Sequence, residues 1–373
     1  MRSRQWMLVV AGVGLLVPLV AFHSSLVGSL STLQHLHGWW LPALLAAELT
    51  SMAAPAVNHQ RLLRLGGLRV PFRSVLAVTF ASNALSVSLP LAGPEVATGY
   101  TLRQFVRRGA AGSAAAWALL VSGLASTVAF AVLVAGGAAA TGNATAVVVA
   151  TAAALLAGVP AFALLSAVRR PGSRQSVQTW TERLLRWSRR AAHRPSADTS
   201  AQVREFLGRF VDQRLSLPDV AAVATGAITN WLADCLCLTL AVVAIGAPVP
   251  WTGLLVVYVG ATAASSLRLT PGGLGVVEAA LTAGLVATGL DTGHALAAAL
   301  LYRLVSFWLV LVGGWVTLLT SSRARERTDP APLPARLPVL GTVVPLQSLR
   351  PPVVDPAPRG SRAGSRPGCL VRG

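Results

Sequence analysis

The segment from Arg268 to Glu278 combines an arginine, a Pro-Gly-Gly turn and a carboxylate between two apolar runs. It reads Arg-Leu-Thr-Pro-Gly-Gly-Leu-Gly-Val-Val-Glu. A helix that is broken at membrane depth persists only where protein or a water-filled cavity satisfies its free backbone groups. The segment therefore predicts a binding site rather than a simple connector.

An anion is the ligand that suits this segment. Its glycines permit positive φ and close backbone approach. A helix that begins near Leu274 would direct its free N–H groups into the break, which is a geometry that binds phosphate. We expect Arg268 and Arg303 to assist in holding the phosphate. The residues predicted to bind substrate in this half are Arg268, Thr270, Pro271, Gly272, Gly273, Gly275, Glu278 and Arg303.

The first half of the chain carries a second segment with the same ingredients, Leu-Pro-Leu-Ala-Gly-Pro-Glu over residues 89–95. Interrupted segments in corresponding halves of one chain are the best pointer in a sequence to a transport site. The residues predicted to form this opposing half are Asn83, Pro90, Gly93, Pro94 and Glu95. The alternative for each segment is a Pro/Gly kink that neighbouring helices relieve.

Acidic residues are scarce, and Glu48 and Asp234 also lie within apolar segments. An ionised side chain there costs about 2.5 to 3.5 kcal/mol. Two interpretations stay open for the acids in apolar segments. They form ion pairs that fix helices together, for which Glu278 or Asp234 could pair with Arg268 or Arg303, or Asp234 and Glu48 form a site for a coupling ion. No metal or cofactor is predicted, because the sequence holds no Walker loop, zinc-ligand pattern or nucleophile elbow. We therefore expect the chain not to be an enzyme.

The elements that must position these residues are membrane helices. Of 373 residues, 54% are hydrophobic and 12% charged, which is typical of an all-α polytopic membrane protein. A span needs about 20 apolar residues. Full spans are predicted at Trp6–Phe22, Trp39–Val57, Ala111–Ala135, Ala144–Val168, Pro218–Ile245 and His294–Leu319. Two interrupted hairpins, Ser74–Arg107 and Trp251–Leu290, either re-enter or cross the membrane. Because they enter from opposite sides, they favour an inverted repeat.

The formal net charge of +18 comes entirely from arginine. The arginines gather in alternate loops, which is the positive-inside pattern of membrane proteins rather than a nucleic-acid surface. We expect a bacterial inner-membrane protein with cytoplasmic termini that contacts anionic lipids. Residues 1–320 form the predicted membrane domain, with an Arg-rich cytoplasmic loop at 169–217. Residues 321–373 form a predicted disordered cytoplasmic tail, since they are rich in Pro, Arg and Gly.

The sequence resembles the flippase-like family that includes the transmembrane region of lysylphosphatidylglycerol synthase. The resemblance rests on residues 270–278, on Ala-Leu-Leu-Tyr-Arg before position 304, on Gly313, and on Pro-Leu-Ala-Gly-Pro-Glu at 90–95, and it covers roughly Trp6 to Thr320. The family usually has a proline where Arg268 stands. It also usually has an arginine shortly after its first Gly-Glu, where this chain has Thr98, Gly99 and Tyr100. In the synthase a soluble aminoacyl-transferase domain follows, and we do not expect lysyl transfer here.

The function predicted on these grounds is a lipid flippase-like protein that moves a phospholipid or lipid-linked head group between leaflets. In that mechanism Glu278 and Glu95 interact with cationic head-group parts, balance the arginines or carry a coupling proton. One alternative is a non-transporting membrane subunit that partners envelope-synthesis enzymes. The other is an integral membrane glycosyltransferase that acts on lipid-linked sugar.

Overall fold

The computed structural model describes residues 36–89, 92–140, 142, 208, 215–266 and 270–328. Within these ranges the chain is helical and contains no β-strand. The first half comprises the 3-10 turn η1 (Gly38–Trp40), α2 (Leu41–Leu65), α3 (Phe72–Ser88), α4 (Gly93–Arg107) and α5 (Gly112–Ala140). The second half comprises α9 (Leu217–Ala244), α10 (Trp251–Ser265), η2 (Pro271–Gly273), α11 (Val276–Ala287), α12 (Thr292–Arg303), the π-helical η3 (Leu304–Leu309) and α13 (Val310–Thr328).

Four helical segments are long and apolar enough to cross a membrane: Gly38–Leu65, Gly112–Ala139, Leu217–Ala244 and Thr292–Thr320. They correspond to four of the six predicted full spans. The other two, Trp6–Phe22 and Ala144–Val168, lie outside the described residues. The described part of the chain is therefore helical throughout its regular structure, and the chain is a multi-pass membrane protein.

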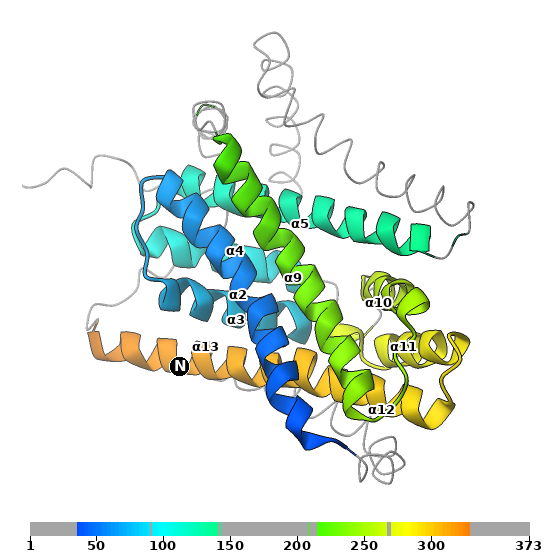
Figure 1. The fold of residues 1–373 in the computed structure, drawn as a ribbon. Helices are drawn as coiled ribbons and strands as arrows, with labels where there is room; N and C mark the ends of the chain where they lie inside the picture. The colour runs from blue at the N-terminus through cyan, green and yellow to red at the C-terminus, as the bar shows by residue number, and fades with distance from the viewer. Residues whose placement is uncertain are drawn as a thin grey trace, which may run out of the picture.

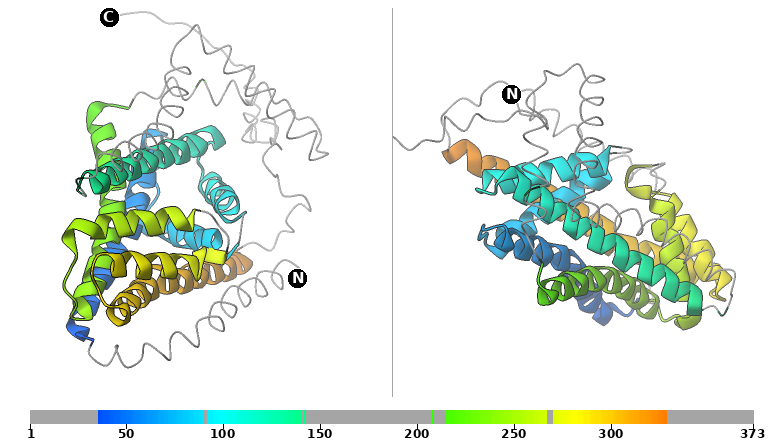
Figure 2. Two further views of the ribbon diagram at one scale, coloured as in Figure 1. Left: turned by 90° about the vertical axis from the view of Figure 1, so that its right-hand side faces the viewer. Right: turned by 90° about the horizontal axis from the view of Figure 1, so that it is seen from above.

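The two predicted hairpins each resolve into a pair of shorter helices. Helices α3 and α4 contain 17 and 15 residues, and α10 and α11 contain 15 and 12. All four are shorter than the roughly 20 residues that a straight span requires. The members of each pair pack against one another, and Figure 2 shows α10 and α11 running alongside each other.

Helices α2 and α9 form the central pair of the fold and run side by side (Figure 1). Ser216 caps α9 by accepting from the N–H of Asp219, and Pro218 occupies the first turn, where it costs no hydrogen bond. The Asp219 carboxylate accepts from Arg61 near the end of α2, at 2.9 Å. This pair joins the start of α9 to the end of α2, so the two helices are antiparallel.

The described core consists of three hydrophobic clusters. The first fills the space among α2, α9, α10, α11 and α12. The second lies among the helices of the first half, and Val223 of α9 joins it. The third joins α3 to the η3–α13 region through residues such as Ala84, Phe307 and Trp315. The first-half hairpin is therefore packed against the last span, and the second-half hairpin against the central pair.

The start of α12 carries a polar cap outside the apolar span. The Asp291 carboxylate accepts from the N–H groups of Gly293 and His294, both at 3.1 Å. These bonds, chiefly that from the His294 backbone, hold the pKa of Asp291 below its ordinary value. Asp291 is therefore ionised at neutral pH.

The last helix differs from the prediction at its end. Helix α13 continues to Thr328, whereas the sequence analysis placed a disordered tail from residue 321. The residues Ser-Ser-Arg-Ala-Arg-Glu-Arg that follow the apolar run are compatible with a helix, because Ala, Arg and Glu have high helix propensity. Residues beyond 328 lie outside the described part, so the tail beyond them stays a prediction.

Candidate functional site

A cavity of about 550 Å³ lies where the breaks of the two interrupted hairpins meet. Ser86, Leu89 and Pro94 line it from the first hairpin. Thr270, Gly272, Gly273 and Arg303 line it from the second half. The central helices add Glu48 and Asp234 to its wall. Segments far apart in the sequence therefore share one cavity.

The Pro-Gly-Gly break has the backbone that its glycines predict. The φ angles of Gly272, Gly273 and Gly275 are 60°, 68° and 81°, in the region that side chains disfavour. A Cβ added at Gly272 would also overlap the ring of Phe307. The Thr270 hydroxyl donates to the carbonyl of Leu274 at 2.7 Å and closes the turn. The break is thus a defined turn whose shape requires glycine.

Glu278 and Arg303 form a buried ion pair beside this turn. The guanidinium Nε donates to Glu278 Oε1 at 2.6 Å, and a second nitrogen donates to the carbonyl of Gly272 at 2.8 Å. The other carboxylate oxygen accepts from the N–H of Gly275 at 2.7 Å. The residues are only 5% and 9% exposed. Pairing therefore occurs, as one interpretation of the intramembrane acids predicts, and it links the start of α11 to the end of α12.

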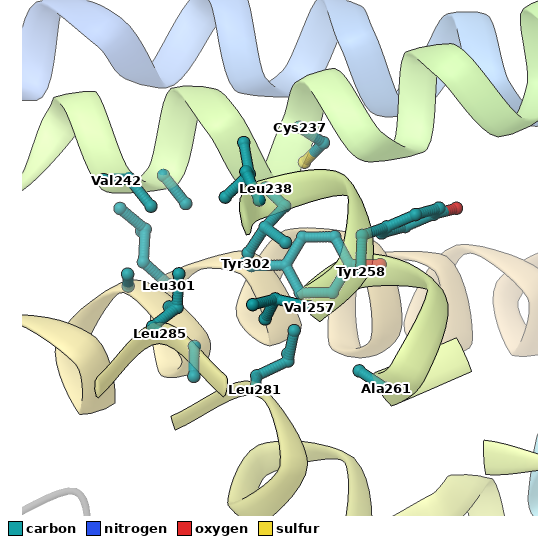
Figure 3. Packing of buried hydrophobic residues seen from close by; sticks show 14 of the residues in the cluster. Cys237, Leu238, Val242, Val257, Tyr258, Ala261, Leu281, Leu285, Leu301 and Tyr302 are labelled. Carbon is teal, nitrogen blue, oxygen red and sulfur yellow. The ribbon is translucent and has the colours of Figure 1, made fainter. Parts of the chain in front are cut away.

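Asp234 is satisfied differently, by tyrosine hydroxyls. Tyr258 of α10 donates to one carboxylate oxygen at 2.7 Å, and Tyr302 of α12 donates to the other at 2.9 Å. Figure 3 shows both rings among aliphatic side chains such as Leu238, Val257 and Leu281. The carboxylate therefore accepts two hydrogen bonds inside the apolar fold. The interaction joins three helices at the wall of the cavity.

Glu48 lies on α2 next to this group and is 2% exposed. Its carboxylate and that of Asp234 interact electrostatically. Among the described residues, no hydrogen-bond partner reaches Glu48 Oε2. The two acids assigned by sequence to an ion pair or a coupling site are therefore neighbours, and only Asp234 has the donors that an ionised carboxylate needs.

Among the described residues predicted for the first half, only Pro94 lines the cavity. The side-chain amide of Asn83 lies 3.0 Å from the sulfur of Met52, and neither Asn83 nor Glu95 is among the lining residues. Glu95 is exposed in the first turn of α4. Gly93 is buried against the backbone of Ser86, where an added Cβ would overlap the carbonyl. The lack of a side chain at Gly93 thus allows the start of α4 to pack closely against the end of α3.

Two predicted residues, Arg268 and Pro90, lie outside the described residues. Pro271 is the first residue of η2. The sequence reasoning missed Tyr258 and Tyr302 as site residues. A signal was available, because the chain has 3 tyrosines and an aspartate in a span requires donors from other helices.

The comparisons with known proteins agree with this architecture. A family model described as the lysylphosphatidylglycerol synthase TM region matches residues 6–314. A UPF0104 membrane protein of Pyrococcus horikoshii is 26% identical over 118 residues, which cover 31% of this chain and 35% of that relative. The second match therefore concerns about a third of the relative. Because the family match spans most of the sequence and includes both breaks, the chain belongs to the lysylphosphatidylglycerol synthase transmembrane-region family.

Proposed function

We propose that this protein moves a phosphate-bearing lipid between the leaflets of a membrane. The observation that carries the proposal is the cavity where the two hairpin breaks meet, because it places an arginine and two carboxylates inside an apolar fold. Buried charges of this kind are costly and mark substrate or ion pathways. A head group that enters such a cavity would exchange water for protein contacts while its acyl chains stay in lipid.

Arg303 is the group through which the cavity would hold a phosphate. It already uses its fork of donors on Glu278 and Gly272. A phosphate is a strong acceptor for the same fork. We infer that the lipid phosphate binds next to Arg303 and that Glu278 balances the arginine when no lipid is present. Arg268 and the start of α11 complete the proposed phosphate site.

The proposed topology is that of the sequence analysis. It has six full spans and two interrupted hairpins, which re-enter or cross the membrane, in an inverted repeat within a membrane domain of residues 1–320. The protein would lie in a bacterial inner membrane with both termini in the cytoplasm. Its partners would be anionic lipids, and it would act by translocation rather than by a chemical reaction. The absence of arginine from the Gly246–Pro250 connection and its presence around Gly67 support this orientation.

Lipid movement in proteoliposomes tests the proposal. The probes are fluorescent phosphatidylglycerol, phosphatidylcholine and a polyprenyl phosphate, each at trace level. Ser266 is exposed at the cavity, so Ser266→Trp should obstruct it. Leu120 on α5 is 54% exposed and lines none of the described cavities, so Leu120→Trp is the matched control. We expect movement by the wild type and by Leu120→Trp, and loss of movement in Ser266→Trp. Equal movement in all three proteins, or none in the wild type, would overturn the proposal.

A further inference from the structure

Glu48 is a buried carboxyl group that has no role in the proposed phosphate site. Its side chain is almost fully buried, and Oε2 has no hydrogen-bond partner in the described part of the chain. A buried ionised carboxylate without donors is strongly disfavoured. A protonated carboxyl has one oxygen that needs no donor, so the protonated form fits this environment better.

The neighbours of Glu48 reinforce this assignment. Asp234 is the better placed of the two acids to hold a negative charge, because Tyr258 and Tyr302 both donate to it, whereas no donor reaches Glu48 Oε2 in the described part of the chain. When two carboxyl groups lie close together in an apolar interior, the ionisation of one makes the ionisation of the other less favourable. The other titratable groups that face the pair are Cys235 and Cys237 from α9 and Arg303 from α12, which acts on Asp234. The hydrogen bonds of Arg303 go to Glu278 and to the Gly272 carbonyl, and none in the described part of the chain goes to Glu48.

We propose that Glu48 and Asp234 form a proton-binding site that couples the movement of an anionic lipid to the movement of one proton. The inference rests on the translocation proposed above. In the binding step, the Glu48 carboxylate takes one proton from a hydronium ion that reaches the cavity, so that an O–H bond forms on Glu48, one O–H bond of hydronium breaks and neutral water is left. Release reverses this step, and Asp234 stays ionised throughout.

The coupling follows from the shared cavity. Glu48 and Arg303 both line it, so a phosphate bound at Arg303 adds negative charge near the carboxylate pair. Added negative charge favours the protonated form of Glu48. By linkage, the bound proton favours the phosphate to the same extent. A proton and an anionic head group are therefore expected to cross together, and the pair carries no net charge if the lipid carries one negative charge.

The bound proton is tested without any transport. Infrared spectra of the purified full-length protein at neutral pH report the C=O stretch of protonated carboxyl groups. We expect a carboxylic acid band in the wild type that is absent from Glu48→Gln. Asp291→Asn is the matched control, because Asp291 is ionised and outside the cavity and asparagine also caps helices. A spectrum that Glu48→Gln leaves unchanged would overturn the proton site.

The coupling is tested in vesicles of phosphatidylcholine that contain trace fluorescent phosphatidylglycerol. Under an imposed pH gradient, the lipid should accumulate in the leaflet on the alkaline side, up to about tenfold for each pH unit, since one proton crosses per lipid. A membrane potential alone should leave the distribution even. Wild type and Asp291→Asn should respond to the pH gradient, and Glu48→Gln should not.

The two tests separate the two proposals. Lipid movement that ignores the pH gradient, or that follows a sodium gradient instead, would overturn the coupling while translocation stands. A wild type that moves no lipid would overturn translocation and coupling together, even if the infrared band is present.

Discussion

Arg303 is held by an anion, a carbonyl and an aromatic face. Glu278 and the Gly272 carbonyl accept its hydrogen bonds, and its guanidinium carbon lies 4.3 Å from the centre of the Phe307 ring. Removal of one charge of a buried pair leaves the other uncompensated, which costs more than the removal of both. The energetic role of the pair is therefore visible only when single and double variants are compared.

We expect Arg303→Met to lower the free energy of unfolding by about 3 to 5 kcal/mol, because it leaves the Glu278 carboxylate buried without its charged partner. Glu278→Gln should cost less, since the arginine keeps Gly272 and Phe307. The double variant Arg303→Met/Glu278→Gln should recover part of the loss. Unfolding in detergent measures all three, with exposed Arg64→Met as the control. A double variant as unstable as the sum of the single variants would contradict this account.

The tyrosines around Asp234 give a second prediction at this scale. Tyr258→Phe and Tyr302→Phe each remove one hydroxyl donor and leave the ring in place. Each should destabilise the protein by about 1 to 3 kcal/mol, because the carboxylate then lacks a donor. In an Asp234→Asn background the same substitutions should cost clearly less, since a neutral amide tolerates the loss. Thermal unfolding of the single and double variants checks this, and costs that are independent of residue 234 would refute it.

At the scale of elements, the contact of α3 with α13 depends on one of two adjacent glycines. A Cβ at Gly314 would meet the Phe80 carbonyl and would lie 2.5 Å from Ala84 Cβ. A Cβ at Gly313 would lie 3.6 Å from the Phe80 ring, which is an ordinary contact. The two helices therefore approach closely along the Gly314 side, as small residues allow in membrane proteins.

We expect Gly314→Ala to destabilise the protein by about 1 to 3 kcal/mol through overpacking against backbone. Gly313→Ala should be neutral or stabilising by up to about 1 kcal/mol, since alanine has the higher helix propensity. The pair is matched in chemistry and in position along α13. Unfolding in detergent would show the difference, and equal effects of the two substitutions would mean that the helices do not approach as described.

Hydropathy predicted the long helices well and their interruptions less well. The spans within α2, α5 and α9 follow from continuous apolar runs, and Pro and Gly marked both breaks. The π-helical segment at Leu304–Leu309 was not predicted, because Leu-Val-Ser-Phe-Trp-Leu carries no local signal for an extra residue per turn. It follows Arg303 and carries Phe307, which packs on Gly272 and on the guanidinium. Tertiary packing, rather than local propensity, selects this geometry.

At the scale of the whole molecule, the sequence indicated which charged residues lie in the candidate site but not which partners they contact. Scarce charges in apolar runs indicated Glu48, Asp234, Glu278 and Arg303, since such charges are costly. Which carboxylate meets which donor depends on helix packing, and a single sequence does not contain that information. Asp234 meets tyrosines instead of an arginine, and Asn83 contacts Met52 rather than the cavity. Pattern therefore identified the buried charged residues, while tertiary contacts determine their partners.

The orientation of the whole molecule in the membrane is the last prediction. Arg64 and Arg69 flank the α2–α3 connection, whereas the α11–α12 connection contains no basic residue. The positive-inside rule places the first connection in the cytoplasm and the second outside. Both Arg69 and Thr292 are exposed, so each can be replaced by a labelling site. In a Cys235→Ala, Cys237→Ala, Cys369→Ser background, an impermeant maleimide should label Thr292→Cys in right-side-out vesicles and Arg69→Cys only in inverted vesicles. Labelling of both from the same side would contradict the topology, because an odd number of crossings must separate them. It would then also remove the argument that the hairpins enter from opposite sides, on which the inverted repeat depends.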